Sequence, residues 1–226
     1  MSPRLLFSDP QSAADALTFA SRAARFTTEG VRLQASGGLL AMTAAALAPR
    51  GFGDPTPTVL ALRTLAADPE LVCDLVVEAS ALSAIADDAT AVLLPDTALS
   101  PAWAGIAPPR EGWALRDGIE ASVLAAKAQG GIARVADAVP TDAGEDAVRA
   151  VRASVWGAPD DELGGLPLGV AFAALSMGFI NGGETARVLV SGPWTRISLQ
   201  RGHVIVRGPV ATGLTAVRRT GTTGNG

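Results

Sequence analysis

Several residue types on which common catalytic sites depend are scarce in this chain of 226 residues. Cys73 is the only cysteine, so no disulfide can form within the chain, and His203 is the only histidine. One cysteine and one histidine cannot supply the usual nitrogen and sulfur ligands of zinc. A Ser–His or Cys–His mechanism would have to use His203 as its base. Its place beside Arg201 instead indicates an exposed residue at the end of a strand.

Motifs for nucleotides and for membranes are also missing. Residues 51–54 contain two glycines but do not follow a strand and open a helix, so they are not a dinucleotide fingerprint, and no phosphate-binding loop is present. No window of about 18 apolar residues is free of charge, proline or glycine. The N-terminus has one basic residue and a short apolar run, unlike a signal peptide. The sequence therefore predicts a soluble cytoplasmic protein without a cofactor and without membrane attachment.

Apolar residues, in contrast, are abundant. They make up 48% of the chain, and charged residues only 18%, against about 25% in typical soluble domains. Alanine richness is one explanation, and an apolar surface covered by a second copy of the chain is the other. We expect self-association as a homodimer. Lys127 is the sole lysine, and arginine combined with much alanine, glycine and valine is typical of bacteria with GC-rich genomes.

The segment 167–180 is the predicted centre of the fold. Only Ser176 carries a polar side chain, and the large apolar residues point to every side of a helix, which predicts a helix that is buried all round. Two helical regions are expected before it. They begin at capping patterns formed by Asp117 with Glu120 and by residues 142–145, and Gly130-Gly131 should kink or split the first of them.

Strands are predicted on both sides of these helices, after a first helix that Asp9 and Pro10 begin. Since strands and helices do not alternate one for one, the predicted fold class is α+β. It consists of an antiparallel β-rich N-terminal half, three consecutive helices and a C-terminal antiparallel β-meander. The predicted strands are residues 5–7, 31–35, 39–47, 58–65, 71–79, 91–94, 186–190, 194–199 and 203–207.

The domain organisation follows from composition. We interpret residues 1–219 as a single domain with two lobes, residues 1–96 being mainly β with one N-terminal helix and residues 117–210 helical and then β. Residues 95–118 hold four prolines together with Trp103 and Trp113, which predicts a loop laid over the core and pinned by the indole rings. Residues 220–226 have the composition of a disordered tail.

Positive charge is concentrated at the C-terminal end. From residue 182 onward there are six arginines and one acidic residue, so this segment carries +5 and the remainder −9. A basic sheet face could bind RNA, an acidic protein or a phosphorylated ligand, although RNA-binding sheets usually add exposed Phe or Tyr and this chain has no tyrosine. The favoured alternative is that these arginines pair with the acidic excess of the first 181 residues, in one chain or across a dimer. The candidate residues are Arg187, Arg196, Arg201, His203 and Arg207.

A second candidate site is the acidic run Asp160, Asp161 and Glu162, directly before the apolar helix. Three carboxylates on one loop could hold Mg²⁺ or Ca²⁺ together with other oxygens. The alternative, which we favour, is a solvated loop whose charge suits the positive end of the next helix.

Residues 13–47 resemble the opening helix and hairpin of a processivity sliding-clamp module. The resemblance implies a helix followed by two antiparallel strands and covers less than a fifth of the chain. Clamps have repeated modules and a basic inner ring of helices, whereas here three helices follow one another and the first helix carries only Arg22 and Arg25. No family is therefore assigned on this resemblance.

Three functional hypotheses follow. The first is a non-enzymatic interaction, regulatory or assembly protein that acts as a homo-oligomer. The second is an enzyme or binder of an anionic small molecule that combines the carboxylates Asp160 and Asp161 with Arg196 and Arg201. The third is nucleic-acid binding through the C-terminal sheet.

Overall fold

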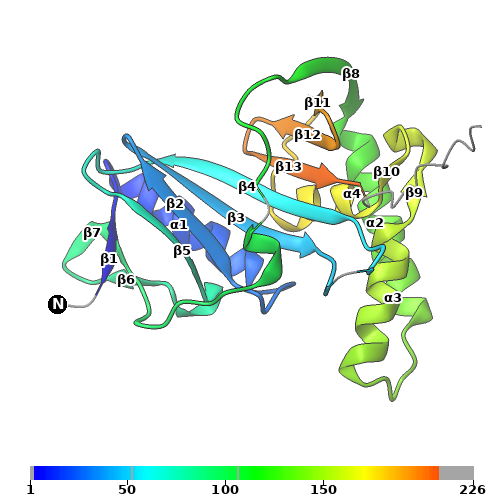
Figure 1. Ribbon diagram of the computed structural model, residues 1–226, viewed down its shortest axis with the longest axis horizontal. Helices are drawn as coiled ribbons and strands as arrows, with labels where there is room; N and C mark the ends of the chain where they lie inside the picture. Colours follow the sequence, from blue (N-terminus) through cyan, green and yellow to red (C-terminus); the bar gives the residue numbers. More distant parts are fainter. Residues whose placement is uncertain (1–2, 52, 106, 209–226) are drawn as a thin grey trace, which may run out of the picture.

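The structure is a computed structural model that describes residues 3–51, 53–105 and 107–208. Its centre is a single antiparallel sheet of eight strands (Figure 1). With helices packed on this sheet, the predicted α+β class is confirmed. From edge to edge the strands are Cys73–Val77 (β5), Val31–Ser36 (β2), Leu39–Leu47 (β3), Thr58–Ala66 (β4), Gly202–Arg207 (β13), Trp194–Leu199 (β12), Thr185–Ser191 (β11) and Ala114–Glu120 (β8).

Two three-stranded meanders meet in the middle of this sheet. β2, β3 and β4 form the first, and β11, β12 and β13 form the second. They join where β4 pairs with β13, with His203 opposite Leu62 and Arg207 opposite Thr58. The strand order is therefore palindromic around this pair, although no repeat is visible in the sequence. The C-terminal meander and the β-rich character of the N-terminal half were predicted, whereas the union of the two meanders depends on a long-range pairing that has no local signal.

The two faces of the sheet have different surroundings. Leu33, Met42, Ile197 and Val204 belong to the main core together with helix residues, and we call this the inner face. Leu60 and Ile205 lie on the opposite, outer face, in a smaller apolar cluster. Because side chains alternate along a strand, each strand contributes to both faces.

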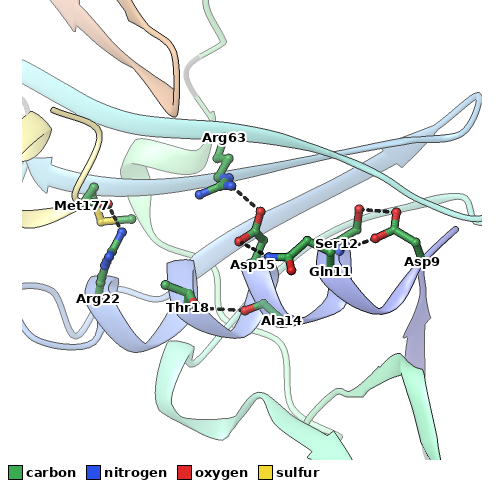
Figure 2. Close-up of polar contacts among 9 residues, drawn as sticks. All are labelled: Asp9, Gln11, Ser12, Ala14, Asp15, Thr18, Arg22, Arg63 and Met177. Atoms are coloured by element: carbon green, nitrogen blue, oxygen red, sulfur yellow. Dashed lines mark hydrogen bonds and ion pairs between the residues drawn. The ribbon is translucent and has the colours of Figure 1, made fainter. Parts of the chain in front are cut away.

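The first helix, α1 (Pro10–Ala23), lies on the inner face of the N-terminal meander. It begins as predicted, since the Asp9 carboxylate accepts a hydrogen bond from the Ser12 amide at 2.8 Å and Pro10 follows (Figure 2). Next to α1 stands a small antiparallel sheet. Its strands are β1 (Arg4–Leu6), β7 (Asp88–Leu93) and β6 (Ser83–Ile85), and the short turn η1 (Ala79–Ala81) precedes β6.

Three further helices follow β8, as predicted, but two of their beginnings differ. α2 (Ala121–Ala138) starts after β8, so residues 117–120 are strand and not a helix cap, because they pair with β11. α3 (Glu145–Gly157) has Gly144 at its N-cap without a side-chain hydrogen bond, so no capping box forms there. α4 (Gly169–Ser176) occupies the predicted central position, and residues 177–180 continue it as a turn and coil. Between α3 and α4 lie β9 (Pro159–Asp160), η3 (Asp161–Leu163) and β10 (Leu166–Pro167).

The Gly130-Gly131 pair does not split α2, although a split was one of the two predicted outcomes, the other being a kink. Trp156 of α3 packs against α2 so closely that a Cβ on Gly131 would lie 2.1 Å from Cζ3 of its ring. Trp156 in turn stacks on Phe172 of α4, with 4.6 Å between the ring centroids. The glycine is therefore a packing requirement between helices, and this contact outweighs its low helix propensity. Beyond this contact α2 and α3 project from the sheet as a helical hairpin (Figure 1).

The proline-rich connection between β7 and β8 lies over the outer face, as predicted. Its short helical turn η2 (Ala102–Gly105) carries Trp103, which is 2% exposed and packs with Ala45, Leu60 and Ile205. Trp113 is half-buried in the same cluster. The predicted tail at residues 220–226 lies outside the described residues.

Apolar content is largely accounted for by the core, which is rich in small residues. In the described part of the chain, five large hydrophobic side chains are exposed. Leu39, Leu115 and Ile132 stand on β3, β8 and α2, and Val72 and Leu99 lie in connecting segments. The homodimer thus stays a prediction. No helix among the described residues is long and apolar enough to cross a membrane.

Candidate anion-binding site

Basic side chains from three neighbouring strands meet on the outer face of the C-terminal meander. In the pairing register Arg187 of β11 stands opposite Ser198 of β12, and Ser198 stands opposite His203 of β13. Arg196 lies two residues before Ser198 and therefore on the same face. We call this surface the arginine face; it consists of Arg187, Arg196, Arg207, His203, Ser198, Trp113 and Trp194.

Two of the arginines are held by indole rings. The guanidinium carbon of Arg196 lies 4.8 Å from the ring centroid of Trp113, and that of Arg207 lies 5.7 Å from the ring centroid of Trp194. The Nε atoms of both arginines are buried and have no hydrogen-bond partner in the described residues. A buried donor without a partner costs about 1–3 kcal/mol, and cation–π stacking offsets about 0.5–2 kcal/mol of this. The stacking orients both guanidinium groups without neutralising them.

The arginine face carries no negative charge of its own. Every Asp and Glu of the chain lies among the described residues, yet none forms an ion pair with Arg187, Arg196 or Arg207 there. Burial, and then the charge of Arg187, lowers the pKa of Arg196 from its usual value. Pairing with acidic residues of the same chain, one form of the favoured sequence interpretation, is therefore absent from the described residues for these three arginines, and pairing across a dimer stays a prediction.

Arginines of the N-terminal half show the opposite arrangement. Arg32 donates to both carboxylate oxygens of Asp74 at 2.8 Å. Arg63 forms an ion pair with Asp15 of α1, and Arg22 donates to the carbonyl oxygen of Met177 at 2.7 Å (Figure 2). The fold thus satisfies its N-terminal arginines and leaves those of the arginine face without acidic partners.

His203 is half-buried on this face rather than exposed at the strand end as predicted, because its side chain points into the row formed with Ser198. Its Nδ1 lies 3.1 Å from Oγ of Ser198. Burial, and then the charges of Arg196 and Arg187, lower the pKa of His203 below its ordinary value of 6.5. The imidazole is consequently neutral at pH 7. In a serine nucleophile's triad a carboxylate orients the histidine, whereas here two cations stand beside it.

The other predicted site residues lie elsewhere. Arg201 is exposed in the turn between β12 and β13. Asp160 and Glu162 bind Lys127 of α2, at 3.0 and 2.8 Å, within the helix layer on the inner side of the sheet. They are therefore not brought together with Arg196, which stands on the outer face. No group of three or more His, Cys, Asp or Glu side chains that could hold a metal ion occurs in residues 3–51, 53–105 and 107–208. Asp161, the third member of the predicted acidic run, is therefore not part of such a group either.

A cleft of about 680 Å³ lies between the end of β3 and α3. Its charges are largely paired, since Asp146 contacts both Arg50, at 3.2 Å, and Arg149, at 3.4 Å. It shares no residue with the arginine face. The sequence analysis did not assign Trp113, Trp194 and Ser198 to this site. The alternation of β12 could have indicated Trp194 and Ser198, because it puts both on the same face as Arg196.

Comparison with known proteins gives no functional assignment. Residues 1–105 match a domain of unknown function (DUF8010), and residues 108–211 match another (DUF8185). No curated protein is similar to the chain.

Solved structures that are similar in fold are bacterial sliding clamps. The DNA polymerase sliding clamp of Caulobacter crescentus is 14% identical, with a TM-score of 0.46, and the match covers 99% of this chain and 70% of the clamp. The DNA polymerase III β subunit of Thermotoga maritima is 14% identical, with a TM-score of 0.48, over 92% of this chain and 65% of that one. The sliding clamp of Bartonella birtlesii bound to griselimycin is 14% identical, with a TM-score of 0.48, and the match covers 98% of this chain and 69% of the clamp. This chain thus spans about two thirds of their length.

Proposed function

We propose that this chain is a non-enzymatic binding protein and that its arginine face holds an acidic segment of a partner protein. The observation that carries the proposal is the group of like charges on β11, β12 and β13 without acidic partners in the described residues. Like charges held close together destabilise a protein unless an anion stands between them. Carboxylates of a partner supply that anion, and guanidinium groups bind them with charge-assisted hydrogen bonds.

A macromolecular partner suits this surface better than a small molecule. Small ligands are usually enclosed in pockets, and neither of the two best-formed cavities of the described residues contains a member of the arginine face. Acidic protein also suits it better than single-stranded nucleic acid. Bases stack on free aromatic faces, and here Arg196 and Arg207 lie over the rings of Trp113 and Trp194.

Calorimetric titration with poly-L-glutamate at low ionic strength tests the proposal. Arg187→Ala and Arg196→Ala should each weaken binding by about tenfold or more, because each removes charge-assisted hydrogen bonds. Arg149→Ala is the matched control. It removes one positive charge from an exposed residue of α3 that already pairs with Asp146, and should bind as the parent does.

The same titration with DNA and RNA separates the alternatives. Equal losses in all three variants would mean that only net charge matters, and the arginine face would then not be the site. Failure of poly-L-glutamate to bind, together with salt-dependent binding of DNA or RNA, would favour the nucleic-acid hypothesis and overturn this one.

A further inference from the structure

We propose that the acidic partner binds as an additional β-strand along the free edge of β8, next to the arginine face. This inference rests on the function proposed above and names the form in which the partner is recognised. An extended peptide can add to an exposed sheet edge, where main-chain hydrogen bonds give affinity and alternate side chains give specificity.

The two edges of the eight-stranded sheet differ in how they are covered. At β5 the chain covers part of the edge itself, since the Leu99 amide donates to the Val76 carbonyl at 2.7 Å and the two residues form an isolated β-bridge. At the other end β8 pairs with β11 on one side, and on its other side no strand of the described residues pairs with it. Six of its seven residues are exposed. Backbone donors and acceptors of β8 are thus accessible to a partner.

Side chains beside this edge define which strand would fit. Leu115 of β8 is 66% exposed and stands opposite Leu189 of β11 on the outer face. Arg196 follows in the same row on β12, opposite Leu189. An apolar side chain of an added strand would therefore contact Leu115, in the row that continues across Leu189 to Arg196.

The next row favours an acidic residue. Arg187 is exposed on β11, and the pairing of β8 is irregular where it passes this residue, between Ala186 and Val188. Gly118 lies in that irregular stretch, where a Cβ would lie 2.6 Å from Cγ2 of Thr185. Gly118 therefore places no side chain between the edge and Arg187. Because both rows lie on the outer face, residues i and i+2 of an added strand occupy them, so an apolar residue followed two positions later by an acidic one matches the two rows.

Charged residues on β8 bear on whether a second copy of this strand could be the occupant. Glu120 accepts a hydrogen bond from the Thr185 hydroxyl, at 2.6 Å, while Asp117 is exposed. A second copy of β8 is a poorer occupant in the central registers, because antiparallel pairing centred on Arg116 or on Asp117 would oppose like charges.

The experiment uses peptides of the repeat Val-Thr-Glu-Thr, in which Val and Glu alternate along one face of a strand, and we call these the alternating peptides. They are compared with peptides of the same composition in scrambled order, using fluorescence anisotropy with the full chain. The alternating peptide should bind about tenfold more tightly than the scrambled one. N-methylation of every second residue removes donors along one edge of a strand, so of the two possible methylation patterns one should abolish binding and the other should retain it. Amide hydrogen exchange of residues 114–120 should slow when the peptide is bound.

Substitutions connect the result to the edge. Leu115→Asn should weaken the alternating peptide by about tenfold and leave poly-L-glutamate unchanged, because it removes the apolar contact without adding charge, whereas Arg196→Ala should weaken both. Ile132→Asn, at an exposed apolar residue of α2, is the matched control. Equal affinity of all peptides, with binding of poly-L-glutamate intact, would overturn strand addition while the proposed function stands. If no acidic probe binds, both proposals fail. A dimer that Leu115→Asn dissociates would identify a second copy as the occupant and overturn the inference.

Discussion

Two adjacent glycines of α2 should respond in opposite ways to the same substitution. A Cβ on Gly130 would have no heavy atom within 4 Å, whereas a Cβ on Gly131 would lie 2.1 and 2.5 Å from two ring carbons of Trp156. Trp156 is 2% exposed and stacks on Phe172, so its ring has little room to move away. Gly130→Ala should therefore stabilise the protein and Gly131→Ala should destabilise it.

The size of the difference can be worked out from these contacts. Replacing Gly by Ala inside a helix gains about 1 kcal/mol, and this gain applies to both positions. Overpacking of a well-packed core costs about 1–3 kcal/mol, and the upper end applies where the neighbour is a confined ring. The net effects are then about −2 kcal/mol for Gly131→Ala and about +1 kcal/mol for Gly130→Ala. With a urea dependence of about 2 kcal/mol per molar, the two unfolding midpoints should differ by about 1.5 M.

Urea unfolding followed by circular dichroism measures both midpoints. A third comparison uses Trp156→Phe, which lacks the outer ring carbons that Gly131→Ala would meet. In that background Gly131→Ala should cost less than in the parent chain, because the two substitutions are coupled. Coincident midpoints for Gly130→Ala and Gly131→Ala would refute the argument that Trp156 requires the glycine.

Three further predictions concern the arginine face and the assembly. Arg196→Met should abolish anion binding but keep or raise the urea midpoint in anion-free buffer. The reason is that it removes a buried donor without a partner and a charge that repels Arg187. A clear loss of stability would count against the site. His203 should titrate below its ordinary pKa of 6.5 in the NMR spectrum of the free protein and at higher pH when an anion is bound. Since its folded pKa is lowered, stability should fall as the pH drops below about 6.5, and His203→Gln should abolish that part of the slope. Light scattering after size-exclusion chromatography should show a dimer at micromolar concentration, and a strict monomer would contradict the homodimer predicted from composition.

Much of the local structure could be predicted because its causes are local. Asp9 and Pro10 define the start of α1 through capping and a preset φ. Gly37 and Gly38, with φ of 59° and 80°, provide the tight turn between β2 and β3. The apolar segment around α4 was correctly placed in the centre. Its period-free pattern predicts burial on all sides, and most of α4 is buried, whereas Phe172 and Leu175 are only partly buried.

Predictions failed where a distant part of the chain decides the outcome. Residues 117–120, which have a helix-capping pattern, form a strand instead, because they pair with β11. The glycine pair of α2 remains helical because a residue of another helix fills the space beside Gly131. Propensity is a matter of about 1 kcal/mol per residue, which one well-packed contact exceeds.

The sequence by itself determined that six arginines and one acidic residue share the last 45 residues. It also determined, through strand alternation, that Arg196 lies on the face opposite to Ile197 and Leu199. Only the tertiary structure decided whether those charges are neutralised. Arg32 and Arg63 find Asp74 and Asp15 because strand pairing and helix packing bring them together across 42 and 48 residues. In the described residues no such element brings a carboxylate into an ion pair with Arg187, Arg196 or Arg207. Charge is a property of the residue, but its compensation depends on which distant carboxylate the fold places beside it.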